Sequence, residues 1–225
     1  MLTLSNVKLN YRKRTILQDV NLTVRPGQTV GLLGLNGSGK STLLLSMAGV
    51  KRPAEGEILL DGKSEKEDPK GYHASIGFVT RENALIDELT AMDNLRLWTD
   101  MDKEGIRNTL ENTNLSVLGV HTWLSTKVSR MSGGMKKRLS IATVLINKPR
   151  ILLLDEPLAA LDLLAKKDIL HFLSLFRAGG GLTVVASHDQ QIFDFCDDIY
   201  LLKDGFCQSL SGLPAGTPVT EVLSR

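Results

Sequence analysis

The stretch that most constrains this chain is a glycine-rich loop between a predicted strand and a predicted helix. In order, its residues are Gly34, Leu35, Asn36, Gly37, Ser38, Gly39, Lys40, Ser41 and Thr42. They fit the pattern G-x-x-x-x-G-K-[ST], with an apolar, β-branched run at 28–33 before them and an apolar helical run at 41–48 after them. This order forms a phosphate cradle, because glycines let backbone N–H groups turn inward and the helix dipole adds positive potential.

The residue types in the loop predict that it binds a nucleotide phosphate together with Mg²⁺. Lys40 is expected to reach the β- and γ-phosphates as a point charge, and the Ser41 hydroxyl is expected to ligate the metal ion. The alternative is a glycine-rich turn without a chemical role, which the strand and helix on either side disfavour.

An acidic pair supplies the second half of the expected site. Residues 151–154 are an uninterrupted apolar run that leads into Asp155 and Glu156, as a central parallel strand ends at an active-site edge. Asp155 is the candidate to hold Mg²⁺ from the side opposite the loop. Glu156 is a candidate general base, because its carboxylate can accept a hydrogen bond from an attacking water. The alternative interpretation is that the pair merely terminates a strand.

Composition limits the classes of protein to consider. With 225 residues, 42% of them hydrophobic and 23% charged, the chain can bury a substantial core, and its net charge of +2 gives no indication of a nucleic-acid partner. No apolar run is as long as a membrane span, and residues 1–5 lack the features of a signal peptide, so we expect a cytosolic location. Cys196 and Cys207 are expected to be reduced structural thiols.

The order of predicted elements indicates an α/β fold of the P-loop NTPase type in one domain, 1–225. We expect a mainly parallel sheet flanked by helices, built from 1–80 and 129–225, with an N-terminal antiparallel β portion and an inserted α-helical subdomain at 81–128. Strands are expected at 2–24, 28–33, 56–60, 74–79, 151–154, 182–186, 198–203 and 205–208, with a hairpin signal at Asp61-Gly62 and an exposed connection at 64–70. Helices are expected at 41–48, 90–123, 132–146, 162–176 and after Pro218.

The tripeptide Ser132-Gly133-Gly134 opens a predicted helix and forms a second possible anion site. As a lone tripeptide it is a weak signal, since Ser-Gly-Gly before a helix is usually just a cap. If it cannot reach the first site within one chain, it must serve the nucleotide of a partner. That case predicts a head-to-tail pair of identical or similar domains.

Taken together, the motifs resemble the nucleotide-binding domain of ATP-binding cassette proteins, over essentially the whole chain. In order, they are 34–41, Ser132-Gly133-Gly134, 151–156, Ala160-Leu161-Asp162 and Val185-Ala186-Ser187-His188-Asp189. The resemblance implies ATP and Mg²⁺ as ligands and further site residues. It implies that Tyr11 stacks on adenine, that Ser132 and Gly134 contact the γ-phosphate bound by the opposing subunit, that Asp162 couples the two sites, and that His188 is the switch histidine.

Two departures from the family pattern bear on the chemistry. Arg81 stands where the family usually has a glutamine after the strand 74–79, and a guanidinium cannot ligate Mg²⁺, so Arg81 must either turn toward phosphate or face away. Met135 replaces a second glutamine and cannot make amide contacts. Lys136, Lys137 and Arg138 follow near a helix N-terminus, which indicates either an anionic neighbour or a solvated basic face. With Lys40, Asp155, Glu156 and His188 in place, we expect hydrolysis to be retained but slowed.

The resemblance favours the ATP-hydrolysing subunit of a bacterial transporter. Such a subunit forms a homodimer or heterodimer around two ATP and drives a separate integral-membrane permease from the inner face of the cell membrane. Residues 82–97 resemble those of exporters, and the residues considered for permease contact, with core packing as the alternative, are Ala84, Leu85, Ile86 and Leu89. The alternative function is a soluble ATPase of the same superfamily. A kinase or GTPase is disfavoured, because no Asn-Lys-x-Asp motif is present and because Ser132-Gly133-Gly134 has no role in them.

Overall fold

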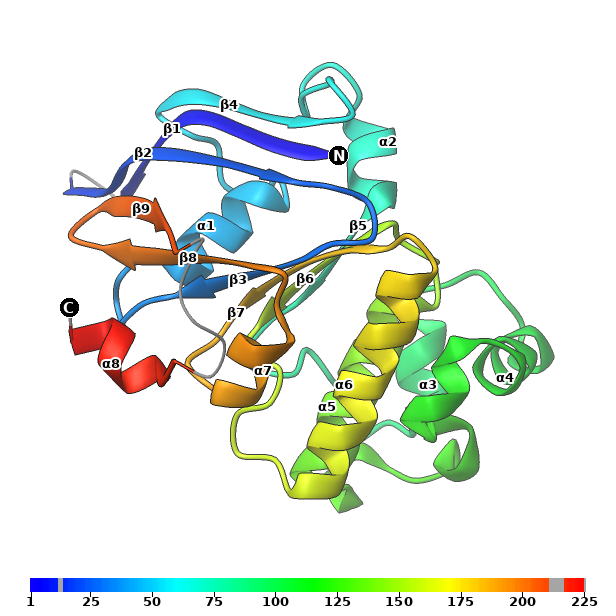
Figure 1. Ribbon diagram of the computed structural model, residues 1–225. Helices are drawn as coiled ribbons and strands as arrows, with labels where there is room; N and C mark the ends of the chain where they lie inside the picture. The colour runs from blue at the N-terminus through cyan, green and yellow to red at the C-terminus, as the bar shows by residue number, and fades with distance from the viewer. Residues whose placement is uncertain (12–13, 211–216, 225) are drawn as a thin grey trace.

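The computed structural model describes residues 1–11, 14–210 and 217–224. Figure 1 shows the arrangement of their helices and strands. In the first half these are β1 (Leu2–Tyr11), β2 (Arg14–Val24), β3 (Thr29–Leu33), α1 (Lys40–Met47), β4 (Glu55–Leu60), α2 (Pro69–Ser75), β5 (Ile76–Val79), α3 (Ala91–Arg96) and α4 (Lys103–Asn112). In the second half they are α5 (Gly133–Leu145), β6 (Ile151–Asp155), α6 (Leu163–Ala178), β7 (Leu182–Ala186), α7 (Gln190–Phe195), β8 (Asp198–Lys203), β9 (Phe206–Ser209) and α8 (Val219–Ser224). Short 3₁₀ turns lie at Asn114–Leu118, Val120–Trp123 and Val128–Arg130.

The described strands join in one nine-stranded sheet with the order β4-β1-β2-β9-β8-β3-β7-β6-β5. Strands β8, β3, β7, β6 and β5 pair in parallel, whereas β1 pairs antiparallel with both β2 and β4. Every residue of β3, β6 and β7 is buried, as expected for parallel strands covered on both faces. These strands therefore form the rigid centre that positions the loops at their carboxyl ends.

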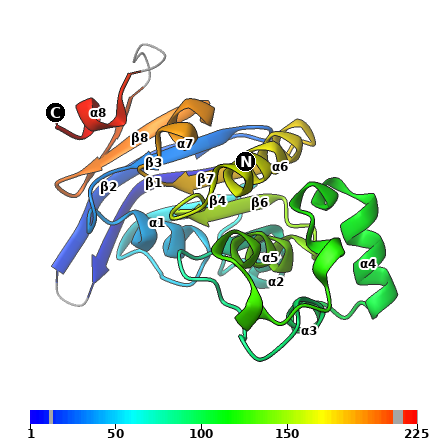
Figure 2. The ribbon, with the colours of Figure 1, turned by 90° about the horizontal axis from the view of Figure 1, so that it is seen from below.

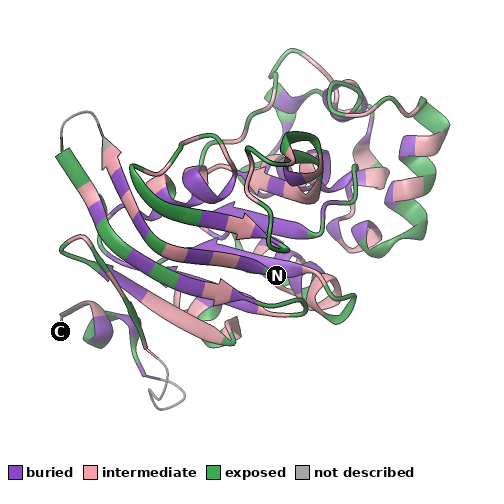
Figure 3. Ribbon diagram, turned by 90° about the horizontal axis from the view of Figure 1, so that it is seen from above, coloured by how far each residue is buried: buried purple, intermediate pink, exposed green. Residues whose placement is uncertain are grey.

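Helix α1 fills the space between the antiparallel strands and the parallel strands. Figure 1 shows it below β1, β2 and β4 and above β3 and β6. Its Leu43, Leu44 and Met47 are fully shielded from solvent and belong to one apolar cluster with side chains from both groups of strands. The antiparallel strands alternate between buried and exposed residues along their length, as Figure 3 shows for this face of the molecule. Their half-exposed character is thus confirmed.

Helices α5 and α6 cover the opposite face of the parallel strands (Figures 1 and 2). The two faces of β6 divide between the two cores, since Ile151 and Leu153 join the cluster around α1 while Leu152 and Leu154 join the cluster around α5 and α6. Buried residues of α3 and α4 belong to this second cluster too, so the helical segment shares a core with the sheet.

The helical segment leaves the sheet after β5 and returns to it before α5. Its two ends are joined by backbone hydrogen bonds, from Val128 N–H to Leu89 C=O at 2.9 Å and from Ser129 N–H to Asp87 C=O at 3.0 Å. Thr90 caps α3 by accepting a hydrogen bond from the Asp93 N–H. The segment extends sideways beyond α5, as Figure 2 shows.

Several local features differ from the sequence-based expectations. The helix expected at 90–123 is divided into α3, α4 and two 3₁₀ turns. Asp61 and Gly62 do form a tight turn with positive φ angles of 50° and 81°, but only a single bridge between Leu60 and Lys63 follows, so no hairpin strand forms. Pro69 begins helix α2, because the Asp68 side chain caps it, and β5 therefore starts at Ile76. Helix α7 was not expected from its short apolar pattern.

Both cysteines are free, as predicted. Burial raises the pKa of the Cys196 thiol and that of the Cys207 thiol to about 12. At neutral pH both thiols are therefore protonated and react slowly as nucleophiles. None of the described helices combines the length and the apolar character needed to cross a membrane.

The thiols provide a test of the native packing. We expect iodoacetamide at pH 8 to alkylate the native chain roughly a hundred-fold more slowly than the chain in guanidinium chloride, because the thiolate is the reactive species and burial suppresses it. Mass spectrometry of timed samples measures both rates. Rapid modification of Cys196 in the native chain would show that β8 and α7 do not pack as described.

Candidate nucleotide-binding site

The phosphate loop lies between β3 and α1, and its glycines are required by its backbone. Gly37 and Gly39 have φ angles of 82° and 103°, in the left-handed region that favours glycine. A Cβ atom on Gly34 would lie 2.6 Å from the Leu202 carbonyl oxygen and would overlap the Ser38 hydroxyl. The loop can therefore take this shape only with glycine at these positions.

The loop is rich in hydrogen-bond donors without acceptors. The Gly37 and Gly39 N–H groups find no acceptor among the described residues, and they stand directly before the N-terminus of α1. The Ser38 hydroxyl oxygen is shielded from solvent and also has no partner within the described chain. A bound phosphate would satisfy these groups, so the loop fits the expected ligand.

Lys40 is the first residue of α1 and its side chain folds back over the loop. Only 7% of the residue is exposed, and its Nζ donates hydrogen bonds to the carbonyl oxygens of Gly34 at 2.6 Å and Leu35 at 3.2 Å. Burial lowers the pKa of Lys40, the nearby carboxylates of Glu156 and Asp155 oppose that shift, and Arg81 adds to it. The ammonium group is thus held at the mouth of the loop by carbonyls that a phosphate can replace.

The acidic pair lies at the carboxyl end of β6. Asp155 and Glu156 are only 6% and 5% exposed. Glu156 has a φ angle of 50°, and its N–H donates to the Ala186 carbonyl oxygen at 2.8 Å, so the neighbouring strand β7 holds this unusual turn in place. The Glu156 carboxylate accepts a hydrogen bond from the Ser187 hydroxyl at 3.2 Å and lies 2.8 Å from His188 Nδ1.

One cleft of about 360 Å³ brings these groups together. Its lining residues are Ile16, Asn36, Gly37, Gly39, Lys40, Ser41, Thr42, Arg81, Asp155 and Glu156. The loop, the acidic pair and Arg81 therefore face the same space. His188 joins them through Glu156, and Ser38 lines an adjoining cleft. Tyr11 ends β1, and its side chain lies outside the described part of the structure.

A second group of predicted residues meets elsewhere. Ser132 caps α5 by accepting a hydrogen bond from the Met135 N–H at 3.2 Å, and Asp162 caps α6 by accepting one from the Ala165 N–H at 2.8 Å. Gly134 packs so closely on α6 that a Cβ atom would lie 2.8 Å from the Ala165 Cβ. Ser132 and Gly133 are exposed, and neither is among the described residues that line the Lys40 cleft.

The basic residues after Met135 all have partners within the chain. Lys136 pairs with Asp87 at 2.8 Å and Arg138 pairs with Asp168 at 2.9 Å. Lys137 is only 4% exposed, and its Nζ donates to the carbonyl oxygens of Thr80 at 3.2 Å and Arg81 at 3.0 Å. Burial lowers the pKa of Lys137. For Lys137, the interpretation as part of a solvated basic face is therefore wrong.

Ile16, Ser187 and Lys137 were not predicted as part of this arrangement. Ser187 could have been found from its position beside His188. Lys137 could have been found from helical spacing, because it lies three residues after Gly134 and four before Ile141, both buried. Ile16 gave no signal, since only the tertiary fold brings β2 to the loop.

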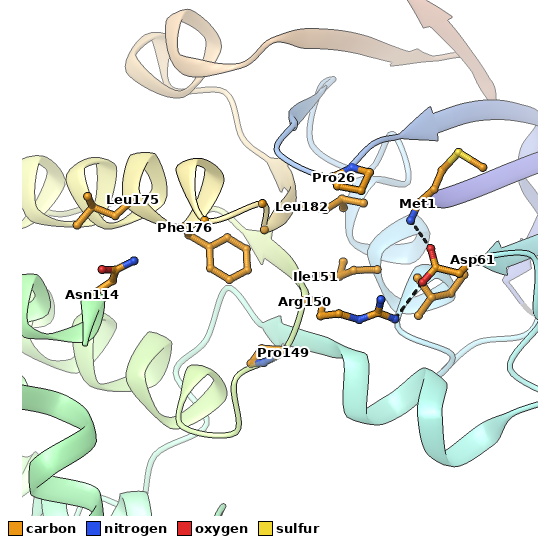
Figure 4. Close-up of a pocket in the computed structure, with 14 residues that line it drawn as sticks. Met1, Pro26, Asp61, Asn114, Pro149, Arg150, Ile151, Leu175, Phe176 and Leu182 are labelled. Carbon is orange, nitrogen blue, oxygen red and sulfur yellow. Dashed lines mark hydrogen bonds and ion pairs between the residues drawn. The ribbon is translucent and has the colours of Figure 1, made fainter. Parts of the chain in front are cut away.

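A cavity of about 400 Å³ lies at the opposite, amino ends of β6 and β7 (Figure 4). Phe176 borders it, and on its far side Asp61 pairs with the Met1 amino group at 2.5 Å and with Arg150 at 3.0 Å. The predicted site residues that the structure describes do not line this cavity. The chemistry therefore belongs to the carboxyl edge of the sheet.

Glycine substitutions test the loop geometry. We expect Gly34→Ala to reduce the free energy of unfolding by about 1–3 kcal/mol, because the added methyl group has no room. Gly133→Ala is the matched control, since a Cβ atom there meets open space in the first turn of α5 and should leave stability unchanged or slightly raised. Urea denaturation measures both, and equal stabilities would contradict the described packing around Gly34.

Comparison with known proteins agrees with this geometry. The family described as ABC transporter matches residues 17–159. The spermidine/putrescine import ATP-binding protein PotA of Spiroplasma citri is 34% identical over 96% of this chain and 62% of its own length. The probable sulfate/thiosulfate import ATP-binding protein CysA of Chlorella vulgaris is 33% identical over 98% of this chain and 97% of its own length. The lipopolysaccharide export system ATP-binding protein LptB of Acidithiobacillus ferridurans is 32% identical over 93% of this chain and 87% of its own length.

The chain spans only part of several relatives, including 62% of the Spiroplasma PotA and 34% of the macrolide export ATP-binding/permease protein MacB of Pasteurella multocida. Among solved structures, an ATP-binding subunit of an ABC transporter superposes with a TM-score of 0.85 at 26% identity, covering 99% of this chain and 97% of that one. A dimeric bacterial ABC transporter cassette superposes with a TM-score of 0.79 at 30% identity, covering 95% of this chain and 100% of that one. The same cassette is known as a dimer with ADP and phosphate. CbiO1 of Clostridium perfringens, part of the ABC transporter complex CbiONQ, has a TM-score of 0.79 at 30% identity, covering 92% of this chain and 86% of that one.

The matched residues include the phosphate loop and the acidic pair, and the structural similarity extends over almost the whole chain. The chain therefore belongs to the ABC transporter family, whose ATP-binding subunits are ATPases.

Proposed function

We propose that this chain binds ATP with Mg²⁺ and hydrolyses it to drive a membrane transporter. The observation that carries the proposal is the single cleft in which the donor-rich loop, Lys40 and Ser41 face Asp155 and Glu156. Cations, N–H groups and carboxylates thus line one and the same cleft. This arrangement suits a polyphosphate that is bound together with a divalent cation.

Each residue has a distinct role in this proposal. The Gly37 and Gly39 N–H groups and the Lys40 ammonium hold the phosphates, and Asn36, Ser38 and Thr42 border them. Ser41 and Asp155 would hold Mg²⁺, which neutralises charge on the β- and γ-phosphates when it is bound. Tyr11 is proposed to stack on the adenine ring, in line with the family resemblance.

Glu156 is the proposed general base. Its carboxylate accepts the proton of a water whose oxygen bonds to the terminal phosphorus, while the bond between that phosphorus and the bridging oxygen breaks and ADP leaves with the electron pair. Ser187 and His188 already contact this carboxylate, at 3.2 Å and 2.8 Å, and so fix its orientation. His188 remains exposed enough to reach the terminal phosphate.

A second subunit completes the proposed site. Ser132 and Gly133 are exposed at the N-terminus of α5, away from the cleft that holds Lys40, and the buried Gly134 follows them beside the exposed Asp162. Placed opposite the Lys40 cleft of another copy or of a related subunit, their N–H groups would meet the terminal phosphate. The dimeric form of a similar cassette supports this arrangement, as either a homodimer or a heterodimer.

The proposed partner in the membrane is a separate permease, which would place this subunit on the inner face of the cell membrane. Ile86, Leu97 and Trp98 of the 81–128 segment are exposed apolar side chains that could contact it, whereas Leu85 packs against the core. This segment is the proposed helical subdomain. The membership of CbiO1 in a transporter complex supports the permease, and a soluble ATPase is the alternative function.

We propose export as the direction of transport. The support is the resemblance of residues 82–97 to the corresponding segment of exporters. The named relatives include both import and export proteins, so direction rests on that segment.

The first test is the ATPase rate of Glu156→Gln. We expect its kcat to fall about 100-fold or more, because the amide cannot accept the water's proton, while ATP affinity is preserved. Glu57→Gln, on the exposed face of β4, is the matched control and should retain the wild-type rate. Equal rates for Glu156→Gln and wild type would remove Glu156 as the base.

The second test identifies the partner. Glu156→Gln, kept in ATP, should co-purify with an integral-membrane protein from detergent-solubilised membranes, because the closed dimer is not released by hydrolysis. Replacement of the exposed Ile86 by Asp should weaken this association without changing ATP affinity. Recovery only in the soluble fraction would favour the soluble ATPase instead.

The third test concerns direction. Once the permease is known, ATP-dependent accumulation of substrate in inside-out membrane vesicles would demonstrate export. Accumulation only in right-side-out vesicles would show import and overturn the proposed direction.

A further inference from the structure

Arg81 lies in the phosphate cleft and has no partner within the described chain. It follows β5 and lines the same space as Lys40, Ser41 and Glu156. Its guanidinium makes no hydrogen bond or ion pair with any described residue. An exposed arginine on an ordinary surface could simply be solvated, but Arg81 is close enough to Lys40 to lower the pKa of that lysine.

Hydrogen bonds from helix α5 fix the backbone at Arg81. The buried Lys137 Nζ binds the carbonyl oxygens of Thr80 and Arg81, and the Thr80 hydroxyl donates to the Glu82 carbonyl oxygen. A buried ammonium group that donates to two adjacent carbonyls holds the chain at this point against α5. The guanidinium therefore starts from a fixed backbone at the rim of the cleft.

The charges in the cleft define what Arg81 can bind. Arg81 and Lys40 repel each other, and the acids Asp155 and Glu156 are buried beside Lys40. An anion between the two cations would relieve their repulsion. A guanidinium has only donors, in a planar fork that matches two oxygens of a phosphate, and it cannot ligate a metal ion.

We propose that Arg81 binds the terminal phosphate of ATP directly, so that it discriminates ATP from ADP and reduces the contribution of Mg²⁺ to ATP binding. This inference rests on the proposed function of the cleft and assigns Arg81 a role within it. The phosphates that ATP and ADP share are held by the loop and Lys40, so these contacts form with either nucleotide. The contact of Arg81 is thus specific to the phosphate that is lost on hydrolysis.

Equilibrium binding of ATP and ADP tests the first part. We expect Arg81→Gln to weaken ATP binding about ten-fold in the presence of Mg²⁺ and to leave ADP binding unchanged, because only ATP carries the contacted phosphate. Arg81→Lys should retain part of the preference, since an ammonium is a single point charge. Arg107→Gln, an exposed arginine on α4, is the matched control and should bind both nucleotides as wild type does.

The Mg²⁺ dependence tests the second part. The ratio of the ATP dissociation constant in EDTA to that in Mg²⁺ should be several-fold larger for Arg81→Gln than for wild type, because the variant has lost the protein cation that shares the phosphate charge. Circular dichroism and thermal unfolding verify that each variant is folded. An equal ratio in variant and wild type would overturn the proposed sharing of charge.

Two outcomes separate this inference from the proposed function. If wild type binds ATP and Lys40→Ala does not, while Arg81→Gln keeps the wild-type affinities or loses ATP and ADP binding equally, then Arg81 does not contact the terminal phosphate and the inference is wrong. If wild type itself fails to bind ATP, the proposed function of the cleft fails, and the role of Arg81 fails with it.

Discussion

The structure depends on the complete burial of strand β6 between two hydrophobic cores. Alternate side chains of Ile151–Leu154 enter opposite clusters, one around α1 and one around α5 and α6, so β6 cannot slip by a residue without moving apolar groups out of both. The register of β6 therefore determines where Asp155 and Glu156 emerge. Because β7 lies between β6 and β3 and all three strands are parallel, the acids emerge at the edge where the phosphate loop begins.

The cleft combines buried charges that balance one another. Lys40, Asp155 and Glu156 are each less than a tenth exposed, a state that is costly for isolated charges. Loop carbonyl oxygens accept hydrogen bonds from the ammonium group of Lys40, and Ser187 and His188 contact the carboxylate of Glu156. The positive φ of Glu156 is held by a hydrogen bond to β7. These contacts hold the charged groups in fixed positions, and charges positioned in this way reduce the reorganisation needed for phosphoryl transfer.

Lys137 connects segments that are distant in the sequence. From α5 it reaches the carbonyl oxygens of Thr80 and Arg81 just after β5, so the helix capped by Ser132 is tied to a residue that lines the nucleotide cleft. If α5 moved on contact with a second subunit, the backbone at Arg81 would therefore move with it. Movement of the 81–128 segment would in turn displace α5. This direct linkage provides a physical route between the membrane-facing segment and the nucleotide in the proposed function.

The sequence by itself determined the phosphate loop, the acidic pair and the order of the strands, because each depends on local spacing, and it located the starts of α3 and α5, which Thr90 and Ser132 cap. Local pattern did not reveal α2, where the Asp68 cap and Pro69 outweighed an apparent strand. Tertiary structure alone decided that Arg81 lines the cleft with Lys40, that the Lys137 ammonium reaches the carbonyl oxygens at the end of β5, and that Ser132 and Gly134 lie outside that cleft. These outcomes depend on contacts between segments that are distant in the sequence, such as the 56 residues between Arg81 and Lys137, for which local sequence spacing carries no signal.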